Sequence, residues 1–287
     1  MSELIATDLH GVRALVTGGT SGLGRAMAEA LALAGAQVVV TSRDRQRAQD
    51  AARRLGTGAL GWAMDVRDPE MVTTAVDEIY ARLGGLDLLV CNAGVGMRTV
   101  NPRFLSEPQP FLEVSPDGFR NVVDTKFIGT FLVARAVVPR MLQGNGGRVV
   151  VISMNSETMT RSGFVPYGPS GAAVEALAQV MAADLMGTSV KLNILLPGGG
   201  SATGMIPMRS YPKFGRDYWI LRSWVLPLSG SPRLRSPTCT VSGSRPPSSG
   251  RGRCTAPADA TVRPSARPRF ATRPSLVPSD SAVQQSR

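Results

Sequence analysis

Residues 14–36 read ALVTGGTSGLGRAMAEALALAGA, and this stretch decides the fold. Its first part, ALVTG (14–18), is a short apolar run that predicts a buried strand. Residues 22–36 have the apolar spacing of a helix, and a glycine-rich turn joins the two segments. A strand that passes through glycines directly into a helix is typical of the first unit of an α/β domain.

The same alternation of strand and helix continues along the chain to about residue 200. Near-continuous Val, Leu and Ile runs predict strands that are buried on both faces, as in a parallel sheet covered by helices. We therefore expect a six-stranded, doubly wound α/β fold of the Rossmann type, forming one domain over residues 1–207. The further predicted strands cover residues 37–43, 60–66, 86–94, 147–153 and 190–199, and the further predicted helices cover residues 43–55, 69–84, 116–142 and 167–185.

The glycine-rich turn is a candidate phosphate-binding loop. Glycines let the backbone turn sharply and approach a pyrophosphate, and the helix that follows offers free N–H groups and the positive end of its dipole. The alternative is an ordinary turn between a strand and a helix. We favour a dinucleotide site, because the glycines stand between a first strand and a helix. The residues expected to hold the pyrophosphate are Thr17, Gly18, Thr20, Ser21, Gly22, Leu23 and Gly24.

The end of the second predicted strand indicates which dinucleotide binds. An acidic residue there would bind the adenosine ribose hydroxyls and favour NAD(H), but this chain has Ser42 and Arg43. Both side chains can hold a 2′-phosphate, so NADP(H) is favoured, with NAD(H) as the alternative. Arg43 could instead start the polar face of the next helix. Asp65, followed by Val66, is placed to meet the adenine amino group, and its alternative role is to cap a helix.

Four motifs in order resemble the short-chain dehydrogenase/reductase family over residues 7–206. Thr17, Gly18, Gly22 and Gly24 match its TGxxxGxG pattern, and the other matches are Asn92-Ala93-Gly94, Tyr167 at the start of a long helix, Pro197-Gly198, and Thr203 beyond it. The resemblance implies an NAD(P)(H)-dependent oxidoreductase that interconverts a small-molecule carbonyl and an alcohol, typically as a homo-oligomer. It also implies that these residues contact the cofactor and that the tyrosine transfers the substrate proton.

The chain departs from the family pattern around that tyrosine. In the family, a lysine four residues later lowers the tyrosine pKa and binds the nicotinamide ribose, but here that position is Gly171. The asparagine that supports a proton-relay water is replaced by Lys126. The family spacing places the substrate-orienting serine at Met154, and we favour the neighbouring Ser153 over Ser156 for this role.

Lys126 offers a replacement for the missing lysine. Because the family's asparagine and lysine belong to one proton relay, we predict that the Lys126 ammonium reaches the space left at Gly171. The alternative is that Lys126 ends in solvent or pairs with an acidic residue. Without a nearby cation, a tyrosine near its ordinary pKa of about 10 is a poor base at neutral pH.

The composition excludes several other chemistries. His10 is the single histidine, so a Ser-His-Asp triad lacks a suitable base. Cys91, Cys239 and Cys254 have neither the spacing of zinc ligands nor the number for a disulfide framework. No apolar run approaches the ~18 residues of a membrane span, and the N-terminal segment does not resemble a signal peptide. The expected location is therefore the cytoplasm.

The composition changes abruptly after Pro207. Residues 208–287 contain 13 arginines, 14 serines and 11 of the 21 prolines, and they account for the whole net charge of +11. Such a segment cannot bury enough apolar surface to offset its ordering entropy, so we expect a disordered tail. Residues 210–230 can be encoded by codons whose shifted reading frame gives a family-like ending. We therefore predict an insertion or deletion near codon 207 that removed the last strand.

The basic tail leaves a second class of function open. The chain could be a non-catalytic remnant that binds the cofactor, or a protein that binds polyanions through its tail. Few aromatic residues accompany the arginines and no compact basic cluster is present, so nucleic-acid binding is not expected. The oxidoreductase interpretation is therefore favoured.

Overall fold

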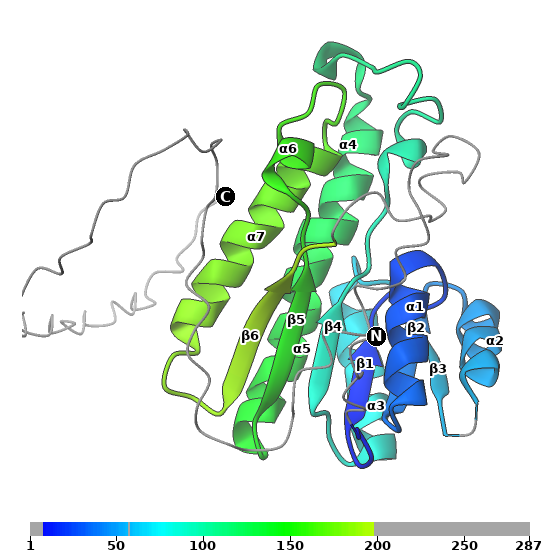
Figure 1. Cartoon of the computed structure of the whole chain (residues 1–287), viewed down its shortest axis with the longest axis vertical. Coiled ribbons are helices and arrows are strands. Elements are labelled where there is room, and N and C mark those ends of the chain that lie inside the picture. Colours follow the sequence, from blue (N-terminus) through cyan, green and yellow to red (C-terminus); the bar gives the residue numbers. More distant parts are fainter. Residues whose placement is uncertain (1–7, 57, 198–287) are drawn as a thin grey trace, which may run out of the picture. The chain divides into compact units, whose positions relative to one another are not determined.

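The computed structural model describes residues 8–56 and 58–197 of the chain. Within them, six strands form one parallel sheet in the order β3-β2-β1-β4-β5-β6 (Figure 1), which confirms the predicted fold. The strands are β1 (Arg13–Val16), β2 (Gln37–Ser42), β3 (Leu60–Ala63), β4 (Leu88–Cys91), β5 (Gly147–Ile152) and β6 (Val190–Leu195). Gly198, Thr203, the tail and the predicted loss of a last strand lie outside the described residues.

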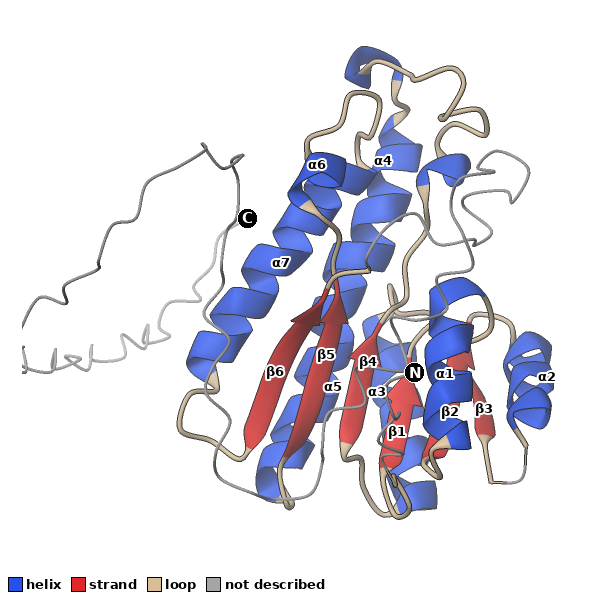
Figure 2. Cartoon of the chain, viewed as in Figure 1, coloured by secondary structure: helices blue, strands red, loops and turns tan. Residues whose placement is uncertain are grey.

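Helices cover both faces of the sheet, as Figure 2 shows. They are α1 (Gly22–Leu33), α2 (Arg45–Leu55), α3 (Pro69–Leu83), α4 (Pro116–Val123), α5 (Gly129–Gln143), α6 (Ser156–Met159) and α7 (Tyr167–Asp184). Successive residues of a strand point to opposite faces. Along β2, Val38 and Val40 therefore pack with α1 and α2, whereas Val39 belongs to the core shared with α3, α5 and α7.

The strand order creates a crevice beside β1. The chain first runs outward from β1 through β2 to β3, and it then returns to place β4 on the other side of β1. The helices that follow β1 and β4 lie on opposite faces of the sheet. Ligands of open α/β sheets bind at such a switch point, outside the carboxyl ends of the strands.

The predicted long helix over residues 116–142 is interrupted. A π-helical turn, Asp124–Ile128, separates α4 from α5, and Lys126 lies in this turn. Single π turns inside α-helices occur frequently at functional sites. The strands also end earlier than predicted, because the residues that follow them turn into loops that line the crevice.

Helix α2 begins two residues later than the predicted helix over residues 43–55, and this start decides the alternative role of Arg43. The helix begins at Arg45, because the Asp44 carboxylate caps it by accepting a hydrogen bond from the Arg47 N–H at 3.0 Å. Arg43 therefore precedes the helix. The alternative in which Arg43 starts the polar face of this helix is wrong.

Strand β6 is covered on one face by α7. Val190, Leu192 and Ile194 point into the core beneath that helix. On the opposite face, Lys191 and Asn193 are exposed, so no described helix lies over this part of β6.

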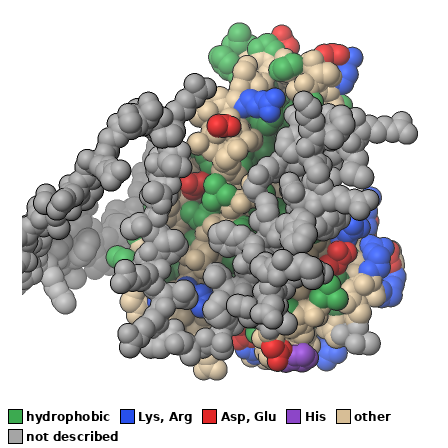
Figure 3. Space-filling model, in the orientation of Figure 1, with side chains coloured by type: hydrophobic (Ala, Val, Ile, Leu, Met, Phe, Trp, Pro, Cys, Tyr) green, Lys and Arg blue, Asp and Glu red, His purple; other side chains and the backbone are tan. Residues whose placement is uncertain are grey.

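Hydrophobic side chains also gather at the end of this domain where the chain leads into α4 (Figure 3). In the short turn η2 (Phe111–Glu113), Phe111 is 67% exposed and Leu112 is 81% exposed.

Across the described residues, no helix combines the length and the apolar character that crossing a membrane requires.

One close contact between α2 and β3 makes a strong prediction about stability. A Cβ atom on Gly61 would lie 2.2 Å from the Ala48 carbonyl oxygen and 2.3 Å from its carbon. Because these are backbone atoms, the helix itself would have to move, and we expect Gly61→Ala to lower the free energy of unfolding by about 3 kcal/mol. Urea denaturation measures this loss.

Gly144→Ala is the matched control for this substitution. Gly144 follows α5 with φ −95°, and its added Cβ would have its nearest neighbour at 3.4 Å. This variant should stay within about 0.5 kcal/mol of the wild type. Equal stability of the two variants would contradict the predicted contact.

Candidate functional site

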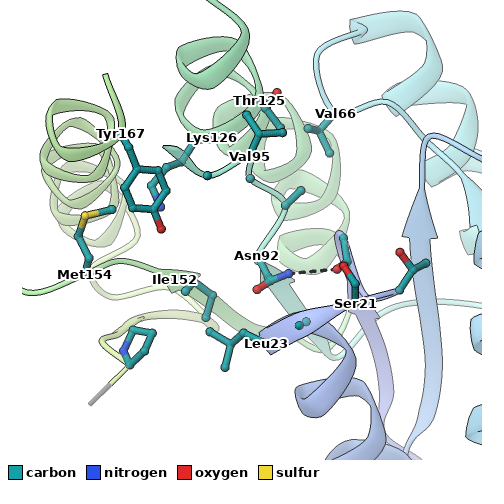
Figure 4. A pocket seen from close by; sticks show the side chains of 18 of the residues that line it. Ser21, Leu23, Val66, Asn92, Val95, Thr125, Lys126, Ile152, Met154 and Tyr167 are labelled. Carbon is teal, nitrogen blue, oxygen red and sulfur yellow. Dashed lines mark hydrogen bonds between the residues drawn. The ribbon is translucent and has the colours of Figure 1, made fainter. Parts of the chain in front are cut away.

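A cavity of about 570 Å³ opens at the carboxyl ends of the strands (Figure 4). Its walls come from the end of β2, the glycine-rich turn, the loops after β3, β4 and β5, and the start of α7. Except for Thr17, every described residue predicted to contact the cofactor lines it. These are Gly18, Thr20, Ser21, Gly22, Leu23, Gly24, Ser42, Arg43, Asp65, Val66, Asn92, Ala93, Gly94, Tyr167 and Pro197, and the predicted Ser153 and Lys126 line it too.

The glycine-rich turn has the shape of a phosphate-binding loop. Gly18 and Gly22 have φ angles of +64° and +53°, a left-handed backbone that favours glycine. A Cβ atom on Gly24 would lie 2.3 Å from the Asn92 side-chain nitrogen and 2.4 Å from the Gly18 carbonyl oxygen. Ser21 makes no side-chain cap on α1, and the first helical turn holds no acidic residue. The N–H groups at this helix start are thus available to an anion.

Thr17 does not line the cavity, but its hydroxyl group connects the glycine-rich turn to the end of β4. Its hydroxyl donates to the Val90 carbonyl at 3.2 Å and accepts from the N–H groups of Asn92 and Ala93, both at 3.0 Å. The Asn92 side-chain amide donates to the Thr17 carbonyl at 2.9 Å. It also donates to the Gly18 carbonyl at 3.3 Å (Figure 4). These bonds fix the ends of β1 and β4 relative to each other.

The end of β2 leaves polar groups facing the cavity. Thr41 lines it, and its buried hydroxyl has no hydrogen-bond partner among the described residues. Such an orphaned group is expected to find its partner in a ligand. Arg43 and Arg47 line the same wall, and the Ser42 hydroxyl accepts from the Asp44 N–H at 3.3 Å.

Asp65 lies beside that wall, because it follows β3, which pairs with β2, and the Met64 N–H donates to the Ser42 carbonyl at 2.8 Å. The Arg67 guanidinium donates to it at 2.6 Å and holds the pKa of this carboxyl below its ordinary value. The capping alternative for Asp65 is wrong, because α3 is capped by Asp68. That carboxylate accepts from the N–H groups of Glu70 at 2.9 Å and Met71 at 3.0 Å.

At the other end of the cavity, Lys126 meets Tyr167. The Lys126 side chain is only 8% exposed, and its ammonium nitrogen lies 5.0 Å from the centre of the Tyr167 ring. It has no carboxylate partner among the described residues. Both alternatives for Lys126, an end in solvent and an ion pair, are therefore wrong for this part of the chain. An unpaired buried amine in a cavity is typical of a functional site.

Burial moves the pKa values of both groups. It lowers the pKa of the Lys126 ammonium to about 8, because the charged form loses its hydration. It raises the pKa of the Tyr167 hydroxyl, again because the charged form is the one that burial disfavours. At neutral pH a protonated lysine therefore lies beside a protonated tyrosine.

The two other departures from the family pattern, Met154 and Gly171, pack against each other. A Cβ atom on Gly171 would lie 2.6 Å from the Met154 methyl carbon and 2.8 Å from its sulfur. Met154 thus occupies the space into which a lysine at position 171 would extend. In Figure 4, Met154 and Lys126 lie on different sides of the Tyr167 ring.

Ser153 is buried directly after β5 and lines the cavity. Its hydroxyl donates to the Glu175 carboxylate on α7 at 2.8 Å. A serine has one O–H to donate, so this bond leaves only its lone pairs for a substrate. The role of Ser153 as the orienting serine stays a prediction.

Sequence reasoning missed the residues that form the far wall of the cavity. The Phe104 and Phe164 rings meet edge to face with their centres 5.6 Å apart. The guanidinium carbon of Arg161 lies over the Phe164 ring, 4.9 Å from the ring centre. These residues lie in loops without periodicity or a motif, so no local signal marks them. The cavity residues that had no predicted role are Thr41, Arg47, Met64, Val95, Gly96, Phe104, Leu105, Thr125, Ile152, Asn155, Thr158, Arg161 and Phe164.

Comparison with known proteins explains this arrangement. A family model described as short chain dehydrogenase matches residues 13–210. The chain belongs to the short-chain dehydrogenase family. It is 32% identical over 206 residues to the 2-dehydro-3-deoxy-D-gluconate 5-dehydrogenase of Formosa agariphila, a match that covers 70% of this chain and 74% of that relative.

Solved structures of other short-chain dehydrogenases share the fold. The 3-ketoacyl-(acyl-carrier-protein) reductase from Brucella melitensis, complexed with NADH, is 27% identical with a TM-score of 0.60, over 66% of this chain and 76% of that one. A metagenomic short-chain oxidoreductase in complex with NADP is 26% identical with a TM-score of 0.60, over 67% and 84%. This short-chain dehydrogenase is accordingly an NAD(P)-dependent oxidoreductase. The alternative of a non-catalytic or polyanion-binding protein is not favoured.

The packing of Met154 on Gly171 predicts that their substitutions are coupled. Gly171→Lys forces the Met154 side chain to move, and Met154→Ser leaves a space that costs about 2 kcal/mol. In the double variant the lysine stem fills the vacated space. We therefore expect its free energy of unfolding to exceed the additive value by about 1 kcal/mol or more.

Urea denaturation of the wild type, both single variants and the double variant measures this coupling. The same cycle with Gly144→Lys in place of Gly171→Lys is the control, because Gly144 does not contact Met154. Strictly additive losses at positions 154 and 171 would show that the two side chains do not share one space.

Proposed function

We propose that this short-chain dehydrogenase binds NADP(H) in its cavity and reduces a small-molecule carbonyl compound, with Tyr167 as the proton donor and Lys126 as the cation beside it. The observation that carries the proposal is the buried Lys126 ammonium, 5.0 Å from the Tyr167 ring centre and without a carboxylate partner among the described residues. Lys126 supplies positive charge next to Tyr167, whereas Gly171, at the position of the family's lysine, has no side chain to do so.

The described residues fit a nicotinamide dinucleotide. The glycine turn and the start of α1 would hold the pyrophosphate, because a Cβ atom on Gly24 would close this cradle and the helix N–H groups lack a side-chain cap. The orphaned Thr41 hydroxyl faces the adenosine side of the cavity. When bound, the nicotinamide would supply the hydride. Ser42 and Arg43, with no acidic residue at the end of β2, favour a 2′-phosphate and hence NADP(H).

Two groups would manage the proton. The raised pKa of Tyr167 keeps its hydroxyl protonated, so it can donate to the substrate oxygen as that oxygen gains negative charge. The phenolate that remains would be stabilised by the Lys126 ammonium. The same raised pKa leaves little of Tyr167 as phenolate at neutral pH, which favours carbonyl reduction, a reaction that needs the protonated hydroxyl, over alcohol oxidation.

Thermal and urea denaturation with each dinucleotide test this proposal. A ligand at 100 times its dissociation constant adds about 2.7 kcal/mol to the free energy of unfolding. We expect NADPH to reach this stabilisation at a lower concentration than NADH. If neither dinucleotide stabilises the protein, the proposed function fails, and if NADH is the better ligand, the NADP(H) preference fails.

The substitution Arg43→Gln tests the source of the preference. Loss of one charged hydrogen bond to a phosphate should weaken NADPH binding roughly tenfold and leave NADH binding unchanged. Arg82→Gln is the matched control, because Arg82 is an exposed arginine of α3 that does not line the cavity. An equal loss of NADPH and NADH affinity would remove Arg43 from the 2′-phosphate site.

Three further statements remain part of the proposal. We propose residues 1–207 as the NAD(P)-binding Rossmann domain and residues 208–287 as a basic tail that a shifted reading frame produced, which the coding DNA around codon 207 tests. We also propose a cytoplasmic location, which fractionation of cells that express the chain would test. We propose a homo-oligomer because the family typically forms one, and a measurement of the protein's molecular mass in solution would test this proposal.

A further inference from the structure

The substrate end of the cavity carries positive charge only, among the described residues. Its charged side chains are Lys126 beside Tyr167 and Arg161 in the loop before α7. The acidic side chain in the described lining is Asp65, which belongs to the adenosine end and is paired with Arg67. An uncompensated pair of cations predicts a ligand that brings negative charge.

Arg161 is built to bind such a charge at the mouth of the cavity. It is exposed, and no described carboxylate pairs with it. Its guanidinium carbon lies over the Phe164 ring, 4.9 Å from the ring centre, and Phe164 itself packs edge to face against Phe104. An aromatic face accepts no N–H hydrogen bond of ordinary strength, so the N–H groups of this guanidinium can still bind an anion.

The wall between Arg161 and Tyr167 is apolar. Met97, Phe104 and Phe164 form one buried cluster, and Leu105 and Tyr167 pack against it. A substrate whose carbonyl lies at the Tyr167 hydroxyl would therefore pass along apolar surface before it reaches Arg161. The site fits a molecule with a polar reacting end, an apolar middle and an anionic end.

We infer that the substrate is an oxo acid, whose carbonyl is reduced at Tyr167 and whose carboxylate, at the far end of an apolar segment, is bound by Arg161. This inference rests on the proposed function. A carboxylate suits the site better than a phosphate monoester, because the mouth offers one guanidinium and a phosphate brings about two negative charges. Lys126 is already engaged by Tyr167 deeper in the cavity.

Ligand binding to the full chain saturated with NADP⁺ tests the inference. The probes are 5-oxohexanoate and 7-oxooctanoate, each compared with its methyl ester, which has the same carbonyl but no charge. We expect at least one acid to raise the melting temperature and to bind roughly tenfold more tightly than its ester. Arg161→Gln should abolish this difference, Arg161→Lys should retain part of it, and Arg82→Gln should leave it unchanged.

The outcomes separate the two proposals. If NADP⁺ stabilises the protein but acids and esters bind equally or not at all, the oxo-acid inference is overturned and the proposed function stands. A difference between acid and ester that persists in Arg161→Gln overturns the assignment to Arg161. Tighter binding of a phosphate-ended oxo compound than of the matching acid overturns the carboxylate. If neither NADP⁺ nor NAD⁺ stabilises the protein, both proposals fall.

Discussion

Replacement of Tyr167 by phenylalanine should lower carbonyl reduction about 1000-fold while NADPH binding and stability stay near the wild-type values. The hydroxyl is the proton donor that we propose for the substrate oxygen, and a positioned acid contributes about 10²–10⁴-fold to a rate. Among the described residues this hydroxyl makes no hydrogen bond, so its removal leaves no buried group unsatisfied. Steady-state turnover and an NADPH titration measure the two effects.

Tyr80→Phe is the matched control for that experiment. Tyr80 is half-buried in α3, and its hydroxyl donates to the Val137 carbonyl at 3.5 Å, outside the cavity. Its loss should leave turnover unchanged. Full activity of Tyr167→Phe would mean that another group, or water, gives the proton.

Replacement of Lys126 by methionine should move activity and stability in opposite directions. Turnover should fall about 100-fold, because the phenolate of Tyr167 loses its neighbouring charge. Burial lowers the pKa of Lys126 from its ordinary 10.5 to about 8. Keeping this lysine charged at pH 7 therefore lowers the free energy of unfolding by about 3 kcal/mol. Methionine removes this cost, keeps the volume and forfeits a cation–π contact of about 1 kcal/mol. The variant should therefore be more stable by about 2 kcal/mol.

The pH dependence gives the sign of this effect. Between pH 8 and 10.5 the unfolded chain holds the Lys126 proton while the folded chain has released it. The wild-type free energy of unfolding therefore rises over this range, and the advantage of Lys126→Met shrinks toward pH 10.5. Wild-type turnover should fall as the pH rises through about 8, because the charged lysine is the form that assists Tyr167.

Urea denaturation at pH 7 and pH 10, together with a pH–rate profile, measures these changes. Lys191→Met is the control, because Lys191 is an exposed lysine whose ammonium donates to the Thr188 carbonyl at 2.9 Å. A loss of stability in Lys126→Met at pH 7 would indicate that the lysine serves the fold and not the reaction.

The fold could be predicted because its determinants are local. Each strand is a short run of β-branched or leucine side chains, and each helix shows its own periodicity and end signals. The π turn at Asp124–Ile128 could not be read in the same way. The apolar periodicity runs through it unbroken, and the extra residue shows only in the backbone hydrogen bonds.

The two ends of the cavity differed in how much the sequence reveals. The candidate phosphate loop can be named residue by residue from the sequence, because glycine spacing and the helix start lie within one short stretch, and its role stays a prediction. Two packing relations were out of reach, since Met154 meets Gly171 and Ser153 meets Glu175 only after β5 and α7 pack together. The sequence predicts that the Lys126 ammonium reaches the space left at Gly171. In the structure Met154 packs on Gly171, and the buried Lys126 lies on a different side of the Tyr167 ring.

The contact between Met154 and Gly171 also constrains how this site can evolve. If only position 171 is changed to lysine, two side chains compete for one space, and if only position 154 is changed to serine, that space stands empty. Each single substitution toward the family pattern therefore lowers the free energy of unfolding, and the second substitution offsets part of that loss. Sequences that carry the family's lysine and serine together are thus separated from the present one by less stable intermediates.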